Sequence, residues 1–113
     1  MLRSVKHKFF AKKTKRGDIT FPSKLEAKAF DVLKSLQESG KILFFLRQIP
    51  VFIGGGHKYI CDFLVFTQDD AFFIEVKGKD LPLGKLKRHQ AEEILGVEIH
   101  VVTDPVQVFG VIS

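Results

Sequence analysis

Two apolar runs near the middle of the chain, residues 58–67 and 71–77, contain charged residues where core residues are expected. Both runs are rich in Phe, Ile and Val, which favours strands that are buried on both faces. Asp62 nevertheless interrupts the first run, and Glu75 and Lys77 interrupt the second. Because side chains alternate along a strand, Glu75 and Lys77 are expected to lie on the same face. Only a few polar residues separate the two runs, which predicts a hairpin.

The register of this hairpin determines how close the acidic residues come. With residues 68–69 as a two-residue turn, Asp62 is directly opposite Glu75, at a Cβ separation of about 4.5–5.5 Å. Two carboxylates this close repel one another and raise each other's proton affinity, so a cation between them is expected. Gln-Asp is not a strong signal for a two-residue turn, so the turn length stays open. A turn of another length would change the register. The alternative is a cross-strand ion pair on a solvated sheet face.

The remaining sequence predicts a small α/β domain. Apolar residues at helical spacing follow Pro22 and Ser23 and end at Gly40, and a second helix with a basic start follows the hairpin. The expected order is a helix at 22–40, strands at 42–53, 58–67 and 71–77, a helix at 85–95 and a strand at 97–102. This order predicts a mixed central sheet flanked by helices. Pro50 predicts that the first strand is bulged or lies at a sheet edge.

Basic residues gather at the N-terminus. Residues 1–18 contain seven Lys and Arg against one acidic residue, whereas the rest of the chain contains 11 basic and 12 acidic residues. Such an arm attracts nucleic acid through counterion release, and the alternative is a solvated terminus that aids solubility. We therefore divide the chain into a basic arm, residues 1–18, and a single domain, residues 19–113. The arm residues expected to contact DNA are Lys12, Lys13, Lys15 and Arg16.

The expected localisation rests on segments that the sequence lacks. No apolar run approaches the about 18 residues that a membrane span needs. The first residues contain no apolar stretch typical of a secretory signal. The single cysteine, Cys61, cannot form an internal disulfide, which is typical of a reducing compartment. A cytoplasmic protein without a membrane partner is therefore expected.

A third acidic residue is available in the first helix. Glu26 shares a face with Ala29 and Leu33, and this face is expected to pack on the sheet. The alternative is a capping box, in which Glu26 bonds back to the amide of Ser23. Three carboxylates suit Mg²⁺ or Mn²⁺, which prefer hard oxygen ligands. A lysine beside such a site can orient a water molecule or stabilise the charge on a phosphate.

The segments FPSKLEAKAF, LRQIPVF, YICDFLVF and IEVKGK follow one another along the chain. They contain Glu26 on the first helix, then Asp62, and then Glu75-Val76-Lys77 after twelve intervening residues. This arrangement resembles the PD-(D/E)XK nuclease superfamily over about residues 20–103. It is most similar to small phage-type endonucleases, including Holliday-junction resolvase-like proteins. The superfamily core is α-β-β-β-α-β, which is the order expected above, and Cys61 replaces the proline that usually precedes the first acidic residue.

The resemblance implies a role for each matching residue. Asp62, Glu75 and the backbone carbonyl of Val76 would bind the metal. Lys77 would be the catalytic lysine, and Glu26 would bind the metal directly or through water. A glutamine found near such sites corresponds to Gln48, for which a satisfied polar group in a strand is the alternative. Four basic residues after the motif would hold phosphates, unless they belong to a solvated helix face: Lys79, Lys85, Lys87 and Arg88.

The expected function is that of a Mg²⁺-dependent DNA endonuclease, with Mn²⁺ as the alternative metal, acting on branched DNA such as a Holliday junction. A resolvase cuts two strands symmetrically, which implies a homodimer. The chain is too short for a separate recognition domain, so DNA shape is read unless an accessory subunit supplies specificity. Alternatives are a nicking, restriction-type or transposition-associated endonuclease, an inactive DNA-binding module of the same fold, and a structural protein with fortuitous charge pairs. The resemblance also implies a bacterial or phage-infected host.

Overall fold

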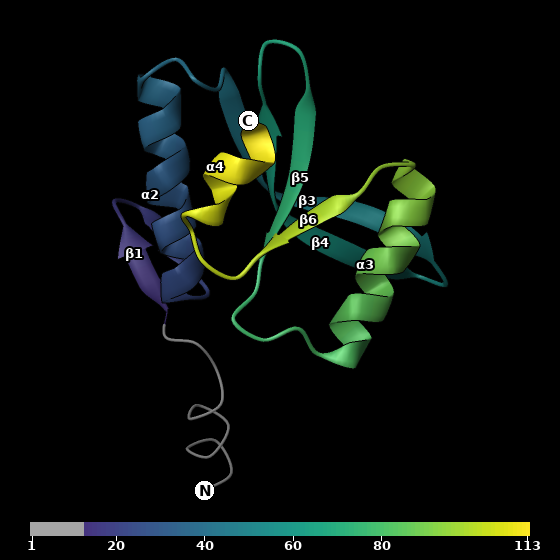
Figure 1. The fold of residues 1–113 in the computed structure, drawn as a ribbon. Helices are drawn as coiled ribbons and strands as arrows, with labels where there is room; N and C mark the ends of the chain where they lie inside the picture. Colours follow the sequence, from purple (N-terminus) through teal and green to yellow (C-terminus); the bar gives the residue numbers. More distant parts are fainter. Residues whose placement is uncertain (1–12) are drawn as a thin grey trace, which may run out of the picture.

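A four-stranded sheet with the order β3-β4-β5-β6 organises the protein (Figure 1). The computed structural model describes residues 13–113. The sheet strands are β3 (Phe44–Gly54), β4 (His57–Phe66), β5 (Ala71–Val76) and β6 (Ile99–Val102). The first three strands are antiparallel, and β6 runs parallel to β5. Helix α3 (Pro82–Leu95) makes the crossover between the parallel strands. The mixed α/β sheet flanked by helices is thereby confirmed.

Helix α2 (Lys24–Glu38) lies within the predicted range of residues 22–40 and is two residues shorter at each end. The hydroxyl of Ser23, the N-cap residue, accepts a hydrogen bond from the amide of Glu26 at 3.0 Å, which satisfies one of the free N–H groups of the first turn. The side chains of Ala29, Leu33 and Leu36 are buried at helical spacing. The helix therefore packs on the sheet through the face that its apolar residues predict.

The β4–β5 hairpin has the predicted register. Its ladder runs from Phe66 and Ala71 to Phe63 and Ile74. The backbone amide of Thr67 donates to the carbonyl of Asp70 at 2.8 Å and closes the turn. The ladder ends at Phe63 and Ile74, however, so Asp62 and Glu75 are not paired within it.

The long β3–β4 ribbon is interrupted where Gln48 faces Asp62. The pairs Arg47–Phe63 and Ile49–Cys61 flank this position, but Gln48 and Asp62 are missing from the ladder. Gln48 has a φ of 54°, the only positive φ of a non-glycine residue in the described part of the chain. The left-handed conformation is unfavourable for a residue with a Cβ, and such strain concentrates at functional sites. At this interruption β4 changes from packing with α3 to packing with α2.

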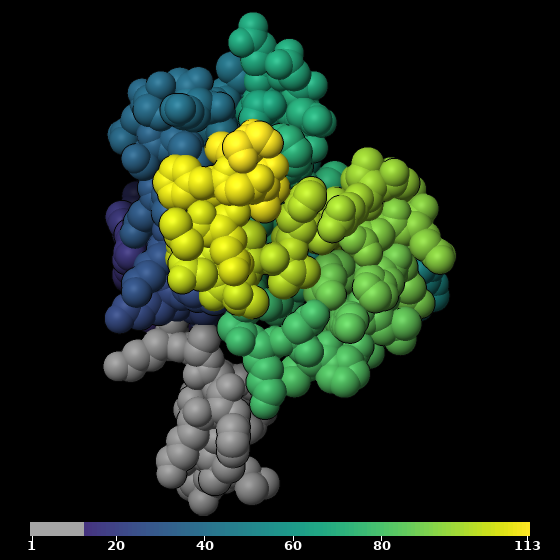
Figure 2. All heavy atoms as spheres, viewed as in Figure 1, coloured from purple at the N-terminus to yellow at the C-terminus, as the bar shows by residue number. Residues whose placement is uncertain are grey.

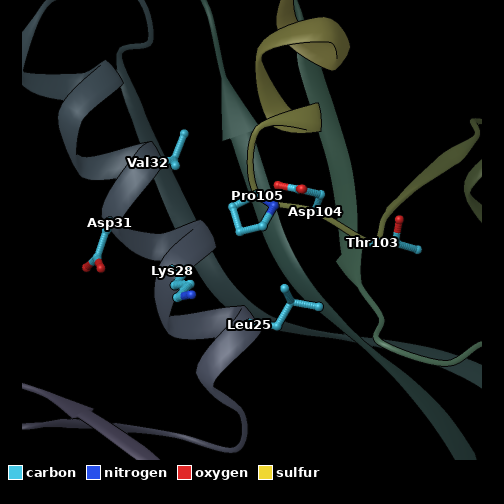
Figure 3. A pocket seen from close by; sticks show the side chains of 7 residues that line it. All are labelled: Leu25, Lys28, Asp31, Val32, Thr103, Asp104 and Pro105. Carbon is cyan, nitrogen blue, oxygen red and sulfur yellow. The ribbon is translucent and has the colours of Figure 1, made fainter.

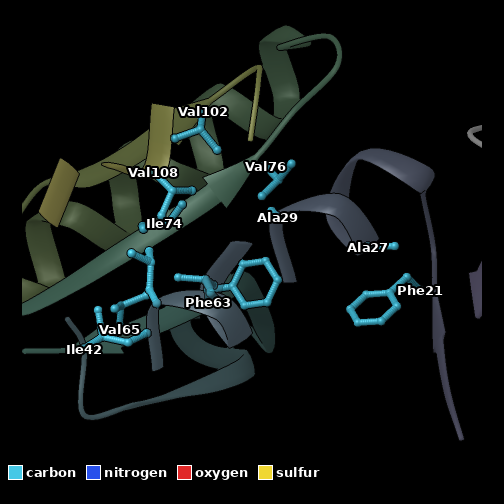
Figure 4. Close-up of a cluster of buried hydrophobic side chains, with 12 residues drawn as sticks. Phe21, Ala27, Ala29, Ile42, Phe63, Val65, Ile74, Val76, Val102 and Val108 are labelled. Atoms are coloured by element: carbon cyan, nitrogen blue, oxygen red, sulfur yellow. The ribbon is translucent and has the colours of Figure 1, made fainter. Parts of the chain in front are cut away.

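Two buried clusters lie on either side of the interruption. The larger cluster joins Phe63 and Val65 of β4 to Leu33 of α2 and to Ile74 of β5 (Figure 4). The smaller cluster joins four strand residues to Ala91 of α3: Val51, Tyr59, Cys61 and Ile99. Residues 59, 61, 63 and 65 share one face of β4 by alternation, yet the first two pack with α3 and the last two with α2. The change at Asp62 lets one strand serve two helices.

Three local features differ from the sequence expectation. Helix α3 begins at Pro82, three residues before the predicted start at residue 85, because proline is favoured in the first helical turn. A short helix, α4 (Gln107–Ile112), occupies the C-terminal tail and packs between α2 and the β5–β6 part of the sheet (Figure 2). Part of the predicted arm forms a hairpin of β1 (Thr14–Arg16) and β2 (Ile19–Phe21). Within residues 13–113, no helix is long and apolar enough to cross a membrane.

The larger cluster is expected to carry much of the stability. Phe63 is fully buried, and replacing a buried Phe with Ala leaves a cavity that costs about 3–5 kcal/mol. Phe63→Ala should therefore lower the free energy of unfolding by this amount in urea denaturation. Phe52→Ala is the matched control, because the Phe52 side chain is 74% exposed in the same sheet. Equal effects of the two substitutions would contradict the proposed core.

Candidate functional site

Three elements bring the predicted site residues to one end of the molecule. Figure 1 shows that α2 begins at the same end at which β5 terminates. Glu26 lies in the first turn of α2, and Asp62 lies at the interruption of β4. Glu75 is the second-last residue of β5, and Lys77 follows that strand. The fold therefore gathers the four predicted catalytic residues around the end of β5.

Glu26 is buried, and its carboxylate points to the sheet. Its Oε2 accepts hydrogen bonds from Gln48 Nε2 at 3.1 Å and from Arg47 Nη2 at 3.4 Å. Ser23 caps the helix through its hydroxyl, but the carboxylate of Glu26 is used by Gln48 and Arg47 instead of bonding back to the N-cap. Only the Ser23 half of the predicted capping box is therefore formed, and the carboxylate of Glu26 belongs to the candidate site.

Asp62 forms a carboxyl pair with Glu26. Gln48, which is bonded to Glu26, faces Asp62 across the β3–β4 ribbon, and the charge of Glu26 acts on Asp62, so the two carboxyl groups lie close together. The pKa of Asp62 is raised from its ordinary value of 3.8 to about 7, mainly by burial and next by the charge of Glu26. Burial also raises the pKa of Glu26. Because both carboxyls resist ionisation together, the pair holds a proton at mildly acidic pH.

The interruption in the sheet explains how Asp62 is held. Its Oδ2 accepts a hydrogen bond from the backbone amide of Val76 at 2.8 Å. This side-chain bond replaces the ladder bond that an undisturbed hairpin would make there. Val76 thus lies beside Asp62 as expected, and metal binding by its carbonyl stays a prediction.

Glu75 belongs to a different network on the α3 side of the sheet. Its Oε1 accepts a hydrogen bond from the hydroxyl of Tyr59, and its Oε2 accepts one from Arg88 Nη1 at 2.9 Å. Arg88 also forms a bidentate pair with Asp80, at 3.0 and 2.9 Å. The carboxyl partner of Asp62 is therefore Glu26, and the direct Asp62–Glu75 pair inferred from the register is not formed. Glu75 acts on Asp62 at longer range, since its charge also raises the pKa of Asp62.

Lys77 lies between the two networks. Its ammonium group has no hydrogen-bond or ion-pair partner among residues 13–113. Its charge lowers the pKa of both Asp62 and Asp80, although other influences dominate each of them. The Nζ atom is 3.8 Å from the position that a Cβ on Gly84 would occupy, so it rests against the first turn of α3. Lys77 is thus a half-buried cation without a fixed partner, close to a protonatable carboxyl pair.

The donor set meets only part of the requirement for a divalent cation. Glu26 and Asp62 provide adjacent hard oxygen ligands, as Mg²⁺ prefers. Both oxygens of Glu75 are occupied by Tyr59 and Arg88. Accordingly, no three His, Cys, Asp or Glu side chains converge as a metal-binding group within residues 13–113. The pair of Glu26 and Asp62 fits a hard cation. Glu75 is turned toward Tyr59 and Arg88 and does not provide the third carboxylate in this conformation.

The predicted DNA contacts fall into four groups. Lys12 lies outside the described residues. Lys13, Lys15, Lys79 and Lys85 are exposed, and Lys87 is half-buried. Arg16 is paired with Asp31 at 2.9 Å, and Gln48 is exposed but bonded to Glu26. Arg88 differs from the others: its side chain is 6% exposed and its guanidinium group is bound to Glu75 and Asp80, which disfavours the predicted phosphate contact.

Sequence reasoning missed three members of the two networks. Arg47 lies over the ring of Phe21, with Cζ 4.3 Å from the ring centroid, and its Nε is buried without a partner in the described residues. The signal was a charged residue beside Gln48 in an apolar run. Tyr59, the only tyrosine, and Asp80 gave no local signal, because their partners are 16 and 8 residues away in sequence.

A separate hollow of about 540 Å³ lies between α2 and the turn after β6 (Figure 3). Its lining includes Lys28 and Asp31 of α2 and Asp104 of the turn, and none of the four predicted catalytic residues. Two of these three charged residues are acidic, which disfavours a phosphate. The hollow is therefore not part of the candidate site.

The fold and the site define a small mixed α/β domain that carries a buried carboxyl pair next to an unpaired lysine. Residues 6–101 match a family described as protein of unknown function (DUF1064), and the chain belongs to this family. No curated protein and no solved structure matches the chain.

The carboxyl pair makes a prediction about pH. The pKa of Asp62 is raised on folding, so its ionisation costs stability as pH rises from about 3.8 to about 7, and the full cost applies above that range. Asp62→Asn removes this charge and should raise the melting temperature at pH 8 by about 4–8 °C, which corresponds to about 1 kcal/mol. The gain should vanish at pH 4. Thermal unfolding without divalent ions checks this, and a destabilised variant at pH 8 would contradict the pairing.

The Glu75 network makes a second prediction. Arg88→Ala leaves the carboxylate of Glu75 buried without its cation, which typically costs about 3–5 kcal/mol. Urea denaturation should show this loss, and Glu75→Gln in the Arg88→Ala background should recover part of it. Arg16→Ala is the control, because the Arg16–Asp31 pair is exposed and should contribute far less. A loss no larger than that of Arg16→Ala would contradict the proposed network.

Proposed function

We propose that this protein is a metal-dependent DNA endonuclease that hydrolyses phosphodiester bonds. The observation that carries the proposal is the Glu26–Asp62 carboxyl pair with the partnerless ammonium group of Lys77 close by. Two adjacent carboxyls with raised pKa values are costly for a fold, and a bound divalent cation would offset their repulsion. The motif order that resembles the PD-(D/E)XK nuclease superfamily supports the same function.

Each residue then has a chemical task. Glu26 and Asp62 would hold Mg²⁺ or Mn²⁺, and the amide of Val76 keeps Asp62 in place. A cation held there would polarise a phosphodiester and would lower the pKa of a water molecule. Lys77 would orient the attacking water or neutralise charge that develops on the phosphate. Gln48 holds Glu26 toward the sheet and leaves one carboxylate oxygen free for the cation.

Exposed basic residues give the substrate its path to the site. Lys79 and Lys85 follow the catalytic segment directly and are exposed, and Lys87 is half-buried on the same helix. Lys13 and Lys15 extend the positive charge toward the start of α2. Contacts of this kind bind the phosphate backbone and do not read bases, which suits recognition of DNA shape. We therefore favour branched DNA, such as a Holliday junction, over a defined sequence.

The assembly and location follow from this substrate. Symmetrical cutting of two strands needs two active sites, so we propose a homodimer, with an accessory subunit as the alternative source of specificity. A nuclease of this type would act in the cytoplasm of a bacterial or phage-infected cell.

One observation favours a second candidate, a DNA-binding module without catalytic activity. Glu75 is bound to Tyr59 and Arg88 and does not join Glu26 and Asp62. If DNA and metal do not release Glu75, the third carboxylate is missing and hydrolysis fails. Nicking, restriction-type and transposition-associated endonucleases remain alternatives within the nuclease class.

A cleavage assay separates these candidates. Fluorescently labelled four-way junctions, flaps and linear duplexes are incubated with the protein and Mg²⁺, Mn²⁺ or EDTA. We expect paired cuts in the junction that disappear with EDTA, and a loss of at least about 10²-fold in rate for Lys77→Ala and Asp62→Ala. Lys34→Ala and Asp69→Ala remove the same charges from exposed positions and should cut normally.

Each other outcome has a distinct meaning. Equal cutting of linear and branched DNA would keep the nuclease and remove the preference for junctions. DNA binding without cutting in either metal would support the inactive module. Cutting that survives both Lys77→Ala and Asp62→Ala would show that the reaction occurs elsewhere or in a contaminant.

A further inference from the structure

A hollow of about 330 Å³ opens between α3 and the β3–β4 turn. Its apolar walls are Ile53 from β3 and Leu83 and Leu86 from α3. Leu83 and Leu86 are 65% and 55% exposed, although leucines at the start of an amphipathic helix normally seek burial. The hollow is close to the lower limit of about 300 Å³ for small-molecule pockets, so it suits a small planar group.

The polar rim of the hollow is suited to nucleic acid. His57, Lys87 and Gln90 line it, and no acidic residue does. The side chains of His57 and Gln90 form no hydrogen bond within the described residues, so their donors and acceptors are available. Lys79 and Lys85 add exposed positive charge on the same segment. The rim therefore offers one cation for a phosphate and two groups that can bond the edge of a base.

The hollow adjoins the candidate site through one turn of helix. Leu83 lines the hollow, and the next residue, Gly84, is in contact range of Lys77 Nζ, 3.8 Å from its Cβ position. A nucleotide whose base enters the hollow would therefore have its backbone near Lys77. The hollow and the candidate site thus share the first turn of α3 as a boundary.

We propose that this hollow binds one unpaired nucleobase of the DNA held at the candidate site. The inference rests on the proposed function and adds the feature of the substrate that is recognised, an unstacked base. The base would stack between Leu83, Leu86 and Ile53, in the way that extruded bases are held between apolar side chains. Gln90 and His57 would contact its edge, and Lys87 would contact its phosphate. Unpaired bases are cheapest to extrude where duplexes branch or bulge, so the hollow would select such DNA.

The test measures binding in EDTA, so it does not depend on cleavage. The full chain is titrated into a duplex with a single-base bulge of 2-aminopurine and into the fully paired duplex that contains the same 2-aminopurine. We expect tighter binding of the bulged DNA and a fluorescence rise for it alone, because a base that leaves the stack loses quenching by its neighbours. Leu83→Ser and Leu86→Ser should each weaken binding of the bulged DNA about tenfold and leave the paired duplex unchanged. Leu43→Ser is the control, since Leu43 is 57% exposed and does not line the hollow.

Several results would overturn the inference. Equal affinity for bulged and paired DNA, with no fluorescence change, would show that no base enters the hollow. Equal weakening of both DNAs by Leu83→Ser would indicate a general backbone contact. Unchanged DNA binding in both leucine variants would leave the hollow to another ligand, such as a protein segment. If metal-dependent cleavage persists in any of these cases, the proposed function stands while the nucleobase site falls; absence of all DNA binding would remove both.

Discussion

The interruption of the β3–β4 ribbon at Gln48 and Asp62 is the constraint on which the core and the candidate site both depend. A regular ladder would keep one face of β4 against one helix. The left-handed backbone of Gln48 breaks the ladder, and along β4 the inward face passes from α3 to α2. The same break places Asp62 beside Glu26 and leaves its second oxygen to the amide of Val76. A backbone that stores strain at this point thereby serves both packing and chemistry.

The four acidic residues around the end of β5 are neutralised in two different ways. Glu75 and Asp80 are neutralised by one arginine, Arg88, whose two pairs tie the loop after β5 to α3. Hydrogen bonds to Asp80 and Glu75 and the charges of both carboxylates raise the pKa of this guanidinium and keep it ionised, although burial acts in the opposite direction. Glu26 and Asp62 receive weaker help, because Arg47 is 3.4 Å from Glu26 and Asp62 has no cation in direct contact within residues 13–113. The uncompensated pair is therefore the place where a divalent cation would contribute most.

The two networks meet at the end of β5, and this arrangement gives the proposed nuclease a way to adjust its site. Glu75 can join Glu26 and Asp62 only by leaving Tyr59 and Arg88. Lys77 is close to both networks and has no partner of its own among the described residues. Phosphate groups of a substrate would compete for cations in this region. Membership of the DUF1064 family leaves this chemistry open, so the function rests on the geometry of these few side chains.

The sequence by itself determined helices α2 and α3, strands β3 to β6, their order, and the register of the β4–β5 hairpin. These features depend on local patterns, namely apolar periodicity, the Ser23 cap and the turn after Thr67. The sequence also identified Glu26, Asp62, Glu75 and Lys77 as the charged residues that the core must accommodate. Only the tertiary structure decided how these residues are paired. Tyr59, Asp80 and Arg88 surround Glu75 because the crossover brings α3 onto the sheet, and a contact between distant segments has no periodic signal in sequence. The break at Gln48 was likewise undetectable, since it coincides with the point where β4 changes from one helix to the other, and this packing joins segments that are distant in sequence.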